Sequence, residues 1–417
     1  MENFIEKVAK KSKTAFRQLS TSKVKQRNLA ILNISKLIQE NTTAIIEANK
    51  LDIIKAKQKK QPGSFLDRLN LDKKRIISMS QSLHEIADLS DPIGLILDSW
   101  KRPNGLNISK VSVPLGIIGI IYESRPNVTI DAGALCIKSG NASILRGGSD
   151  AFNSSKLLTQ IMQKGLSLAN LPIESVQYIN NTDRKLVTQM LQASGHIDVI
   201  IPRGGKSLVS KVQREAKVPV FAHLEGICHV YIDHEADFNV AKKIMINSKL
   251  RRTGICGAAE TLLIDEKIDK KNISMFVNEL IENGCEIRAD KNIYNKFNNV
   301  SLANDKDWST EYLDSIISIK TVEGLSGAIK HINKYSSNHT ESIITKNKKT
   351  AEHFLNHVDS AIVMHNASTQ FADGGEFGMG AEIGISTGRL HARGPVGANQ
   401  LTSFKYIVRG SGQIRKV

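Results

Sequence analysis

From residue 114 onward the chain alternates short apolar runs with amphipathic stretches, and this alternation restricts the fold more than any other feature of the sequence. The apolar runs are rich in β-branched residues, which favours strands, and the stretches between them have helical spacing. Strands that alternate with helices form βαβ units and build parallel sheets. We therefore predict an α/β fold, with a first series of strands at residues 116–122, 142–147, 176–179, 198–202 and 218–223.

A second series of strand-like runs follows, at residues 229–233, 260–265, 315–322, 341–346 and 360–365. A chain of 417 residues is longer than one ordinary hydrophobic core accommodates, so two series of strands indicate two domains. Both are expected to be Rossmann-like. We assign residues 1–102 and 114–225 to a cofactor-binding domain that begins with mostly helical residues, and 226–394 to a catalytic domain.

Two strand-like stretches fall outside these series. They are "LNISKVSV" and "LTSFKYIV", and we assign residues 103–113 and 395–417 to a small β-flap built from them. Exposed strand pairs commonly join another chain through their unpaired edges. We therefore expect a homo-oligomer.

The net charge of +16 would suit a nucleic-acid partner or an anionic ligand. However, the lysines are spread along the chain, without a basic block or interleaved aromatic residues. We predict a solvated basic surface and no nucleic-acid partner; steering of phosphorylated ligands stays open. The sequence contains no apolar run long enough to cross a bilayer and no signal-peptide core at its start, so we expect a cytoplasmic protein without membrane contact.

Four cysteines are far apart and form no CxxC pair, which indicates neither a disulfide framework nor a structural metal site, and no metal is expected. Cys256 lies on a turn between Gly254 and Gly257, after Arg251 and Arg252. Nearby cations or a helix N-terminus would favour the thiolate, which is the nucleophilic form. We predict that Cys256 is a catalytic nucleophile and that the other three, Cys136, Cys228 and Cys285, are structural.

Two Arg-Gly-Gly turns, in "ILRGGSDA" and "IIPRGGKSLV", end predicted strands at the start of helices. Backbone N–H groups at such turns bind the phosphates of dinucleotides. Neither turn is a GxGxxG fingerprint, and glycines that only shape a turn are the alternative. The candidate cofactor-binding residues are Arg146, Gly147, Gly148, Ser149, Arg203, Gly204 and Gly205.

Several long strings resemble one known family. They are "YESRPNVTIDAGALCIKSGNASILRGGSDA", the "TGIC" cysteine loop, "VEGLSGAIKHINKYSSNHTESI" and "FADGGEFGMGAEIGISTGRLHARGP". The sequence resembles the γ-glutamyl phosphate reductases (glutamate-5-semialdehyde dehydrogenases) of the aldehyde dehydrogenase superfamily, from the helical start to the C-terminus. The resemblance implies an aldehyde dehydrogenase-like fold.

The resemblance also implies an activity. Such an enzyme reduces L-glutamyl 5-phosphate with NADPH to L-glutamate 5-semialdehyde and phosphate in proline biosynthesis, through a thioester at Cys256. Functional coupling to glutamate 5-kinase would follow. Asn127 resembles the asparagine that forms an oxyanion hole with the backbone N–H of Cys256. Glu311 resembles the glutamate that binds the nicotinamide ribose, and Arg146 would lie near the 2′-phosphate of the cofactor.

The sequence departs from the hydrolytic members of the superfamily at their catalytic glutamate, where this chain has His223. Glu225, two residues later, is a possible replacement, so a hydrolytic NAD(P)-dependent aldehyde dehydrogenase is the alternative. The cysteine loop has Thr253 and Gly257 where the family commonly has proline and asparagine. For the substrate's α-carboxylate, Arg125 and Arg393 are candidates.

Overall fold

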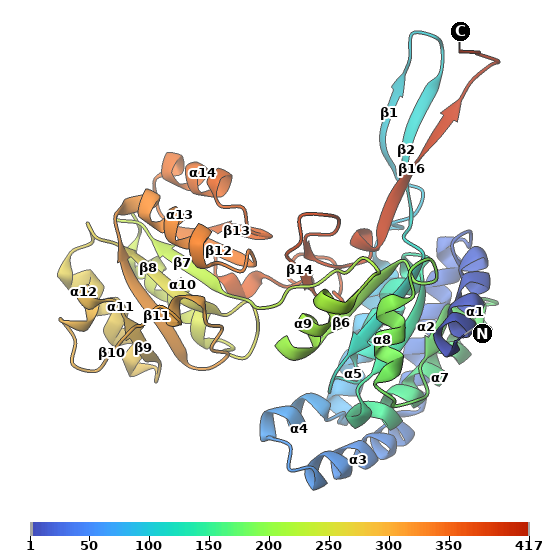
Figure 1. Cartoon of the computed structure of the whole chain (residues 1–417), viewed down its shortest axis with the longest axis horizontal. Coiled ribbons are helices and arrows are strands. Elements are labelled where there is room, and N and C mark those ends of the chain that lie inside the picture. The colour runs from blue at the N-terminus through green and yellow to red at the C-terminus, as the bar shows by residue number, and fades with distance from the viewer. Residues whose placement is uncertain (1–2, 416–417) are drawn as a thin grey trace. The chain divides into compact units, whose positions relative to one another are not determined.

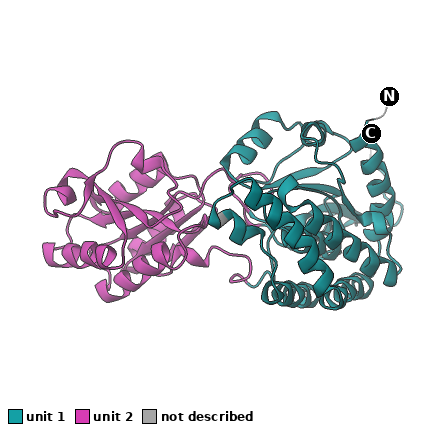
Figure 2. Cartoon of the chain, turned by 90° about the horizontal axis from the view of Figure 1, so that it is seen from below, with its two compact units in different colours: residues 1–222, 378–384, 396–417 teal, residues 223–377, 385–395 magenta. Residues whose placement is uncertain are grey.

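The structure, a computed structural model, describes residues 3–415 and forms two compact units (Figure 2). The first unit comprises residues up to Ala222 together with 378–384 and the segment from Val396 onward. The second comprises His223–Phe377 and Ile385–Pro395. Within residues 3–415, no helix is both long and apolar enough to cross a membrane.

The first unit begins with helices, as the sequence predicts. A capping box starts the first of them, because the Asn3 side chain accepts a hydrogen bond from the Glu6 backbone at 3.0 Å and the Glu6 carboxylate accepts one from the Asn3 backbone at 3.1 Å. The helices are α1 (Phe4–Leu19), α2 (Val24–Glu40), α3 (Thr42–Gln58), α4 (Gly63–Leu69) and α5 (Lys73–Asp88).

The first unit then forms a four-stranded parallel sheet in the order β5-β4-β3-β6. Its strands are β3 (Ile117–Tyr122), β4 (Ala142–Gly147), β5 (Val176–Tyr178) and β6 (Val199–Arg203). The intervening helices are α6 (Val128–Lys138), η1 (Ser149–Ala151), α7 (Phe152–Leu168), η2 (Ile173–Ser175), α8 (Lys185–Gln192) and α9 (Lys206–Glu215). Every residue of β3 and β4 is buried, and the sequence of β3 is accordingly almost continuously apolar.

The predicted strand at 218–223 is wrong. This segment makes a single β-bridge, between Val220 and Ile200. Pro219 lies at its centre, and proline has no backbone N–H to donate to a neighbouring strand.

A separate antiparallel sheet has the order β1-β2-β16 and also belongs to the first unit. Its strands are β1 (Ile96–Lys101), β2 (Asn107–Pro114) and β16 (Thr402–Arg409), and η5 (Asn399–Leu401) precedes the last. Figure 1 shows these strands extending away from the unit's helices. The two predicted flap strands therefore pair, and they are joined by β1, which lies in the range assigned to the cofactor-binding domain.

The second unit contains a seven-stranded parallel sheet in the order β10-β9-β11-β8-β7-β12-β13. The strands are β7 (Cys228–Ile232), β8 (Ala259–Asp265), β9 (Glu286–Ala289), β10 (Ser301–Leu302), β11 (Ile316–Val322), β12 (Thr340–Ile344) and β13 (Ile362–His365). The helices are α10 (Phe238–Leu250), α11 (Lys270–Glu282), α12 (Lys291–Tyr294), η3 (Asp307–Ser309), α13 (Gly324–Tyr335), α14 (Lys348–His357) and η4 (Thr369–Phe371). A short antiparallel pair, β14 (Ile385–Ser386) and β15 (Gly394–Pro395), completes the unit.

The central strands β7 and β8 are buried along their whole length, with apolar clusters on both faces of the sheet. Because β8, β7 and β12 are adjacent and parallel, their amino ends lie side by side at one edge of the sheet. This edge positions the candidate site.

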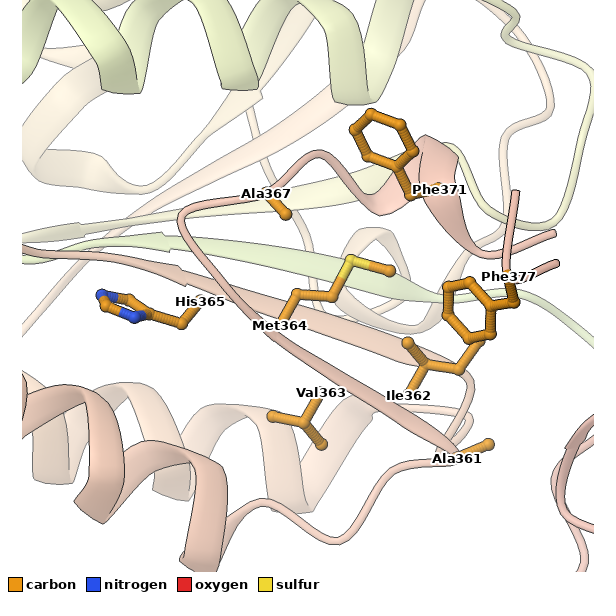
Figure 3. A pocket seen from close by; sticks show the side chains of 8 residues that line it. All are labelled: Ala361, Ile362, Val363, Met364, His365, Ala367, Phe371 and Phe377. Atoms are coloured by element: carbon orange, nitrogen blue, oxygen red, sulfur yellow. The ribbon is translucent and has the colours of Figure 1, made fainter.

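A hollow of about 460 Å³ lies along β13, the strand at one end of this sheet. Figure 3 shows Met364 pointing toward Phe371, while Val363 points to the other side of the strand. The hollow is mostly apolar, and its lining contains none of the predicted site residues. It is lined by Ala361, Ile362, Val363, Met364, His365, Ala367, Phe371 and Phe377.

Candidate active site

Cys256 meets two histidines at the amino ends of three adjacent strands. Cys256 lies in the turn before β8, His223 in the segment that leads into β7, and His339 directly before β12. The Cys256 sulfur and one ring nitrogen from each histidine lie within 4.8 Å of one another. The two imidazole rings meet edge to face, with centroids 5.1 Å apart. The strand order therefore brings together three side chains that are far apart in sequence.

The histidines control the charge of the thiol. Burial alone would raise the pKa of Cys256, but the charge of His339 and hydrogen bonds from His223 and His339 bring that pKa well below its usual value. The other three cysteines lack this effect. Burial raises the pKa of Cys285 to about 12, and it raises the pKa of Cys136 and of Cys228 as well. Cys256 is thus the thiol of this chain that ionises most readily.

The source of this effect differs from the sequence-based expectation. We expected Arg251 and Arg252, or a helix N-terminus, to favour the thiolate. Both arginines are exposed, and Arg251 directs a guanidinium nitrogen to the side-chain oxygen of Gln370 at 3.3 Å. Cys256 lies in a turn before a strand, not at the start of a helix. The imidazoles that lower the pKa lie before β7 and before β12, and pairing between these strands cannot be read from local sequence.

Close backbone packing fixes the cysteine loop. A Cβ atom added to Gly226 would lie 2.1 Å from the carbonyl oxygen of Cys256, so this position requires glycine. The Cys228 thiol donates to that same carbonyl at 3.0 Å. At Gly257 a Cβ would lie 3.1 Å from the carbonyl oxygen of Thr369, whereas Gly254 faces open space. Glycine at 257, where the family commonly has asparagine, therefore fits a tight backbone contact.

Hydrogen bonds orient both imidazoles. Nδ1 of His223 lies 2.6 Å from the carbonyl oxygen of Ile385. Because a carbonyl only accepts, Nδ1 must carry a proton, and the neutral ring then has its lone pair on Nε2. Nδ1 of His339 lies 2.9 Å from the Thr340 hydroxyl. Nε2 of His339 is buried and, within residues 3–415, has no nitrogen or oxygen partner.

Glu311, a predicted cofactor-binding residue, lies beside the cysteine loop. Its carboxylate accepts a hydrogen bond from the Gly226 backbone at 2.9 Å. Burial raises the pKa of Glu311, and the nearby charges of Cys256 and Glu225 raise it further. The structure therefore brings Glu311 to the site of the nucleophile. Its role toward a ribose stays a prediction.

Asn127, the predicted oxyanion-hole residue, lies in the first unit and precedes α6. Its side-chain amide makes no capping hydrogen bond and donates instead to Asp131 at 3.0 Å. Burial raises the pKa of Asp131 to about 6. A role for Asn127 at Cys256 stays a prediction.

The two Arg-Gly-Gly turns both follow carboxyl ends of the four-stranded sheet. Tyr122, the last residue of β3, is paired with Gly147 of β4 on one side and with Arg203 of β6 on the other. At the second turn the Gly205 N–H donates to the carboxylate of Glu123 at 2.9 Å, so a residue of the protein already uses this donor.

The two arginines of these turns have different surroundings. Arg146 is buried and donates to the backbone carbonyls of Gly147 and Thr182. Arg203 is partly exposed and lies 4.0 Å from Glu382. Arg203 is therefore the more accessible cation at this edge.

The substrate candidates are also in separate units. Arg125 is half-buried and lies just after β3 in the first unit. In the second unit, Arg393 forms an ion pair with Asp359 at 2.5 Å, and Arg389 pairs with the same carboxylate at 2.5 Å. Two arginines therefore share one carboxylate, which leaves an excess positive charge in this loop.

The sequence did not identify the histidines as a pair. It marked His223 only as the replacement for a catalytic glutamate, and His339 only as part of a matching string. The available signal was weak: His339, like the cysteine loop, lies just before a predicted strand, whereas His223 ends the strand predicted at 218–223.

Comparison with known proteins identifies the family of the chain. The family model described as "Aldehyde dehydrogenase family" matches residues 2–293. The gamma-glutamyl phosphate reductase of Brucella suis is 54% identical over 409 residues, covering 98% of this chain and 97% of that protein. That of Parvibaculum lavamentivorans is 55% identical over 412 residues, covering 99% and 97%.

Solved structures confirm the predicted fold class. The crystal structure of the gamma-glutamyl phosphate reductase from Thermotoga maritima has a TM-score of 0.97 at 44% identity, covering 99% of this chain and all of that one. A propionaldehyde dehydrogenase from Rhodopseudomonas palustris, 13% identical with a TM-score of 0.70, shares the fold; the match covers 97% of this chain and 96% of that one. The chain therefore belongs to the aldehyde dehydrogenase family and, within it, to the gamma-glutamyl phosphate reductases.

Proposed function

We propose that the chain performs the γ-glutamyl phosphate reductase reaction with NADPH, through a thioester at Cys256. The reductase activity, its place in proline biosynthesis and the use of a nicotinamide cofactor follow from family membership. The thioester and the choice of NADPH are our proposals. The observation that carries the mechanism is the position of the Cys256 sulfur between the imidazoles of His223 and His339, which hold the pKa of the thiol well below its usual value.

The first step uses the thiolate directly. The Cys256 sulfur attacks the acyl carbon of L-glutamyl 5-phosphate, the carbon–oxygen bond to phosphate breaks, and a thioester forms. The departing phosphate takes up one proton, and an imidazole that has accepted the proton of the thiol is placed to supply it. NADPH, when bound, supplies the hydride that reduces the thioester. Collapse of the resulting thiohemiacetal releases the aldehyde and returns the Cys256 thiolate.

The residues available for a cofactor fit NADPH in part. We propose the Gly147–Ser149 turn as a phosphate site, since it ends β4 at the start of a helical segment. Arg146 would have to leave two carbonyl partners to reach a 2′-phosphate. Arg203 is better exposed, and we propose that it supplies the positive charge. Glu311 remains the candidate for the nicotinamide ribose.

The hydrolytic alternative depends on a base that activates water. His223 occupies the position predicted for that base, and its ring lies beside Cys256. Glu225 lies close enough to affect the ionisation of Glu311. We favour the phosphate-releasing reaction, because this chain has a histidine, hydrogen-bonded to the thiol, where the hydrolytic members have their catalytic glutamate.

The mechanism is tested by Cys256→Ala. This variant should lose all turnover while it still binds NADPH, measured by quenching of protein fluorescence. Cys136→Ala and Cys285→Ala are controls that should keep their rate, because both thiols are buried in the cores. A Cys256→Ala enzyme with normal turnover would show that no thioester is needed.

We also propose that the chain forms a homo-oligomer. The flap exposes apolar side chains, among them Ile96 at 68% exposure and Tyr406 at 57%. A second unpaired edge belongs to β13, the strand at the end of the seven-stranded sheet, and an apolar hollow lies along it. Phe404→Lys with Tyr406→Lys should therefore lower the mass measured by light scattering, and a native enzyme that is already monomeric would contradict the proposal.

Two further predictions stay open. An acyl phosphate hydrolyses readily in water, which would make direct transfer from glutamate 5-kinase advantageous. A cytoplasmic location stays a prediction from the sequence.

A further inference from the structure

The three side chains at the candidate active site also form a set of metal donors. One sulfur and two imidazole nitrogens lie within 4.8 Å of one another. Thiolate and imidazole are the ligands that Zn²⁺ prefers, and three protein ligands leave a fourth position open. We propose that Cys256, His223 and His339 bind a divalent cation of the Zn²⁺ class, and that the bound cation blocks the nucleophile. Only the blocking effect rests on the proposed function.

The imidazoles are already oriented as metal ligands. Histidines that bind metals usually donate their other N–H to a carbonyl or another acceptor, which fixes the ring. His223 makes this contact through Nδ1 to the carbonyl of Ile385 at 2.6 Å. His339 is held at Nδ1 by the Thr340 hydroxyl at 2.9 Å, and its Nε2 is buried without a nitrogen or oxygen partner in residues 3–415. Nδ1 of each ring is thus held by an oxygen of the protein, and we assign Nε2 as the nitrogen that would bind the cation.

The required movement is small. Bonds to zinc of about 2.0–2.3 Å place tetrahedral ligands about 3.3–3.6 Å apart. The three donor atoms lie within 4.8 Å of one another, so contraction by little more than about 1 Å is sufficient. Each donor precedes a buried strand of one sheet, which limits how far the ligands can separate.

A second group of candidate ligands lies at the opposite edge of the same sheet and provides the control. His234 Nδ1 lies 2.9 Å from Asp265 and 3.2 Å from Asp233, at the carboxyl ends of β8 and β7. Both carboxylates already accept a hydrogen bond from the Tyr231 hydroxyl. Asp233 accepts another from the Thr345 hydroxyl at 2.6 Å. This group offers mainly oxygen donors and no sulfur, so it suits Zn²⁺ less well.

The test uses the full chain with a phosphine reductant that contains no thiol. Zn²⁺ is titrated in competition with a chromogenic chelator, and Co²⁺ is added separately to detect a sulfur-to-cobalt charge-transfer band. We expect one site per chain, with the band lost in Cys256→Ser. His339→Gln should weaken Zn²⁺ at least about tenfold, since loss of even a supporting contact costs about 10–100-fold. His234→Gln should leave the affinity unchanged within about twofold.

The competing outcomes are distinct. Zn²⁺ binding that survives in Cys256→Ser with unchanged affinity, or that is lost in His234→Gln, would overturn the site. Cys256→Ser is nearly isosteric, so its melting temperature checks that the fold is retained. Binding at the predicted site without loss of NADPH-dependent turnover would overturn the blocking effect. The binding assay needs no catalysis, so a failure of the proposed reductase mechanism would leave its result unaffected.

Discussion

The low pKa of Cys256 predicts an unusual pH dependence of alkylation. A free thiol has a pKa of about 8.5, so its thiolate fraction falls from about one half at pH 8.5 to about one hundredth at pH 6.5, and its alkylation rate falls about 50-fold. The imidazoles of His339 and His223 hold the pKa of Cys256 well below its usual value, despite burial. We expect its alkylation rate to fall by no more than about twofold over this range.

The assay follows iodoacetamide labelling of the Cys256 peptide by mass spectrometry, with a short cysteine peptide as reference. A thiolate with a lower pKa is also intrinsically less reactive. The assay therefore compares the rates of one thiol at two pH values, because its intrinsic reactivity cancels in that ratio. His339→Gln removes the larger of the two imidazole contributions, which is expected to raise the pKa of Cys256 by at least about one unit and to slow labelling at pH 6.5 about tenfold.

Either of two results would refute this reasoning. The Cys256 rate in the native chain could fall as steeply with pH as that of the reference peptide. Alternatively, His339→Gln could leave the native pH dependence unchanged, in which case the thiolate is stabilised by something other than this imidazole.

Two further predictions concern residues around the nucleophile. Gly226→Ala should lower kcat at least about tenfold, because the new Cβ would lie 2.1 Å from the carbonyl oxygen of Cys256 and displace the loop. Displacements of about 1 Å can lower a rate about 100-fold. Gly254→Ala is the matched control and should keep the native kcat, because its Cβ would face open space. Lys249→Met should destabilise the fold by about 3–5 kcal/mol in urea unfolding, because it leaves the buried carboxylate of Glu260 without its partner at 2.5 Å. A loss below about 1 kcal/mol would show that Glu260 is readily accommodated as a neutral acid.

The fold was largely predictable where strands are buried on both faces. The predicted strand at 116–122 covers β3, since a fully buried strand has an almost continuous apolar sequence. Exposed or very short strands were missed. All side chains of β1 are exposed, and β10 contains only two residues, so neither has a clear hydrophobic pattern.

The candidate site was predictable only in part. Cys256 could be identified from its glycine-flanked turn, which is a local feature. Its histidine partners could not, because they meet it only through the order β8-β7-β12. For the same reason no metal-binding group was visible in the spacing of the sequence. The use of the Gly205 N–H by Glu123 was equally hidden, since that contact joins two separate strand ends.

Phosphate dependence of the reverse reaction tests the central claim most directly. NADP⁺ reduction would be measured with glutamate 5-semialdehyde, with and without inorganic phosphate. If Cys256 forms a thioester that phosphate resolves, turnover should depend strictly on phosphate. Sustained turnover without phosphate would mean that water resolves the thioester, contradict the phosphate-releasing mechanism, and direct attention to Glu225 as the base.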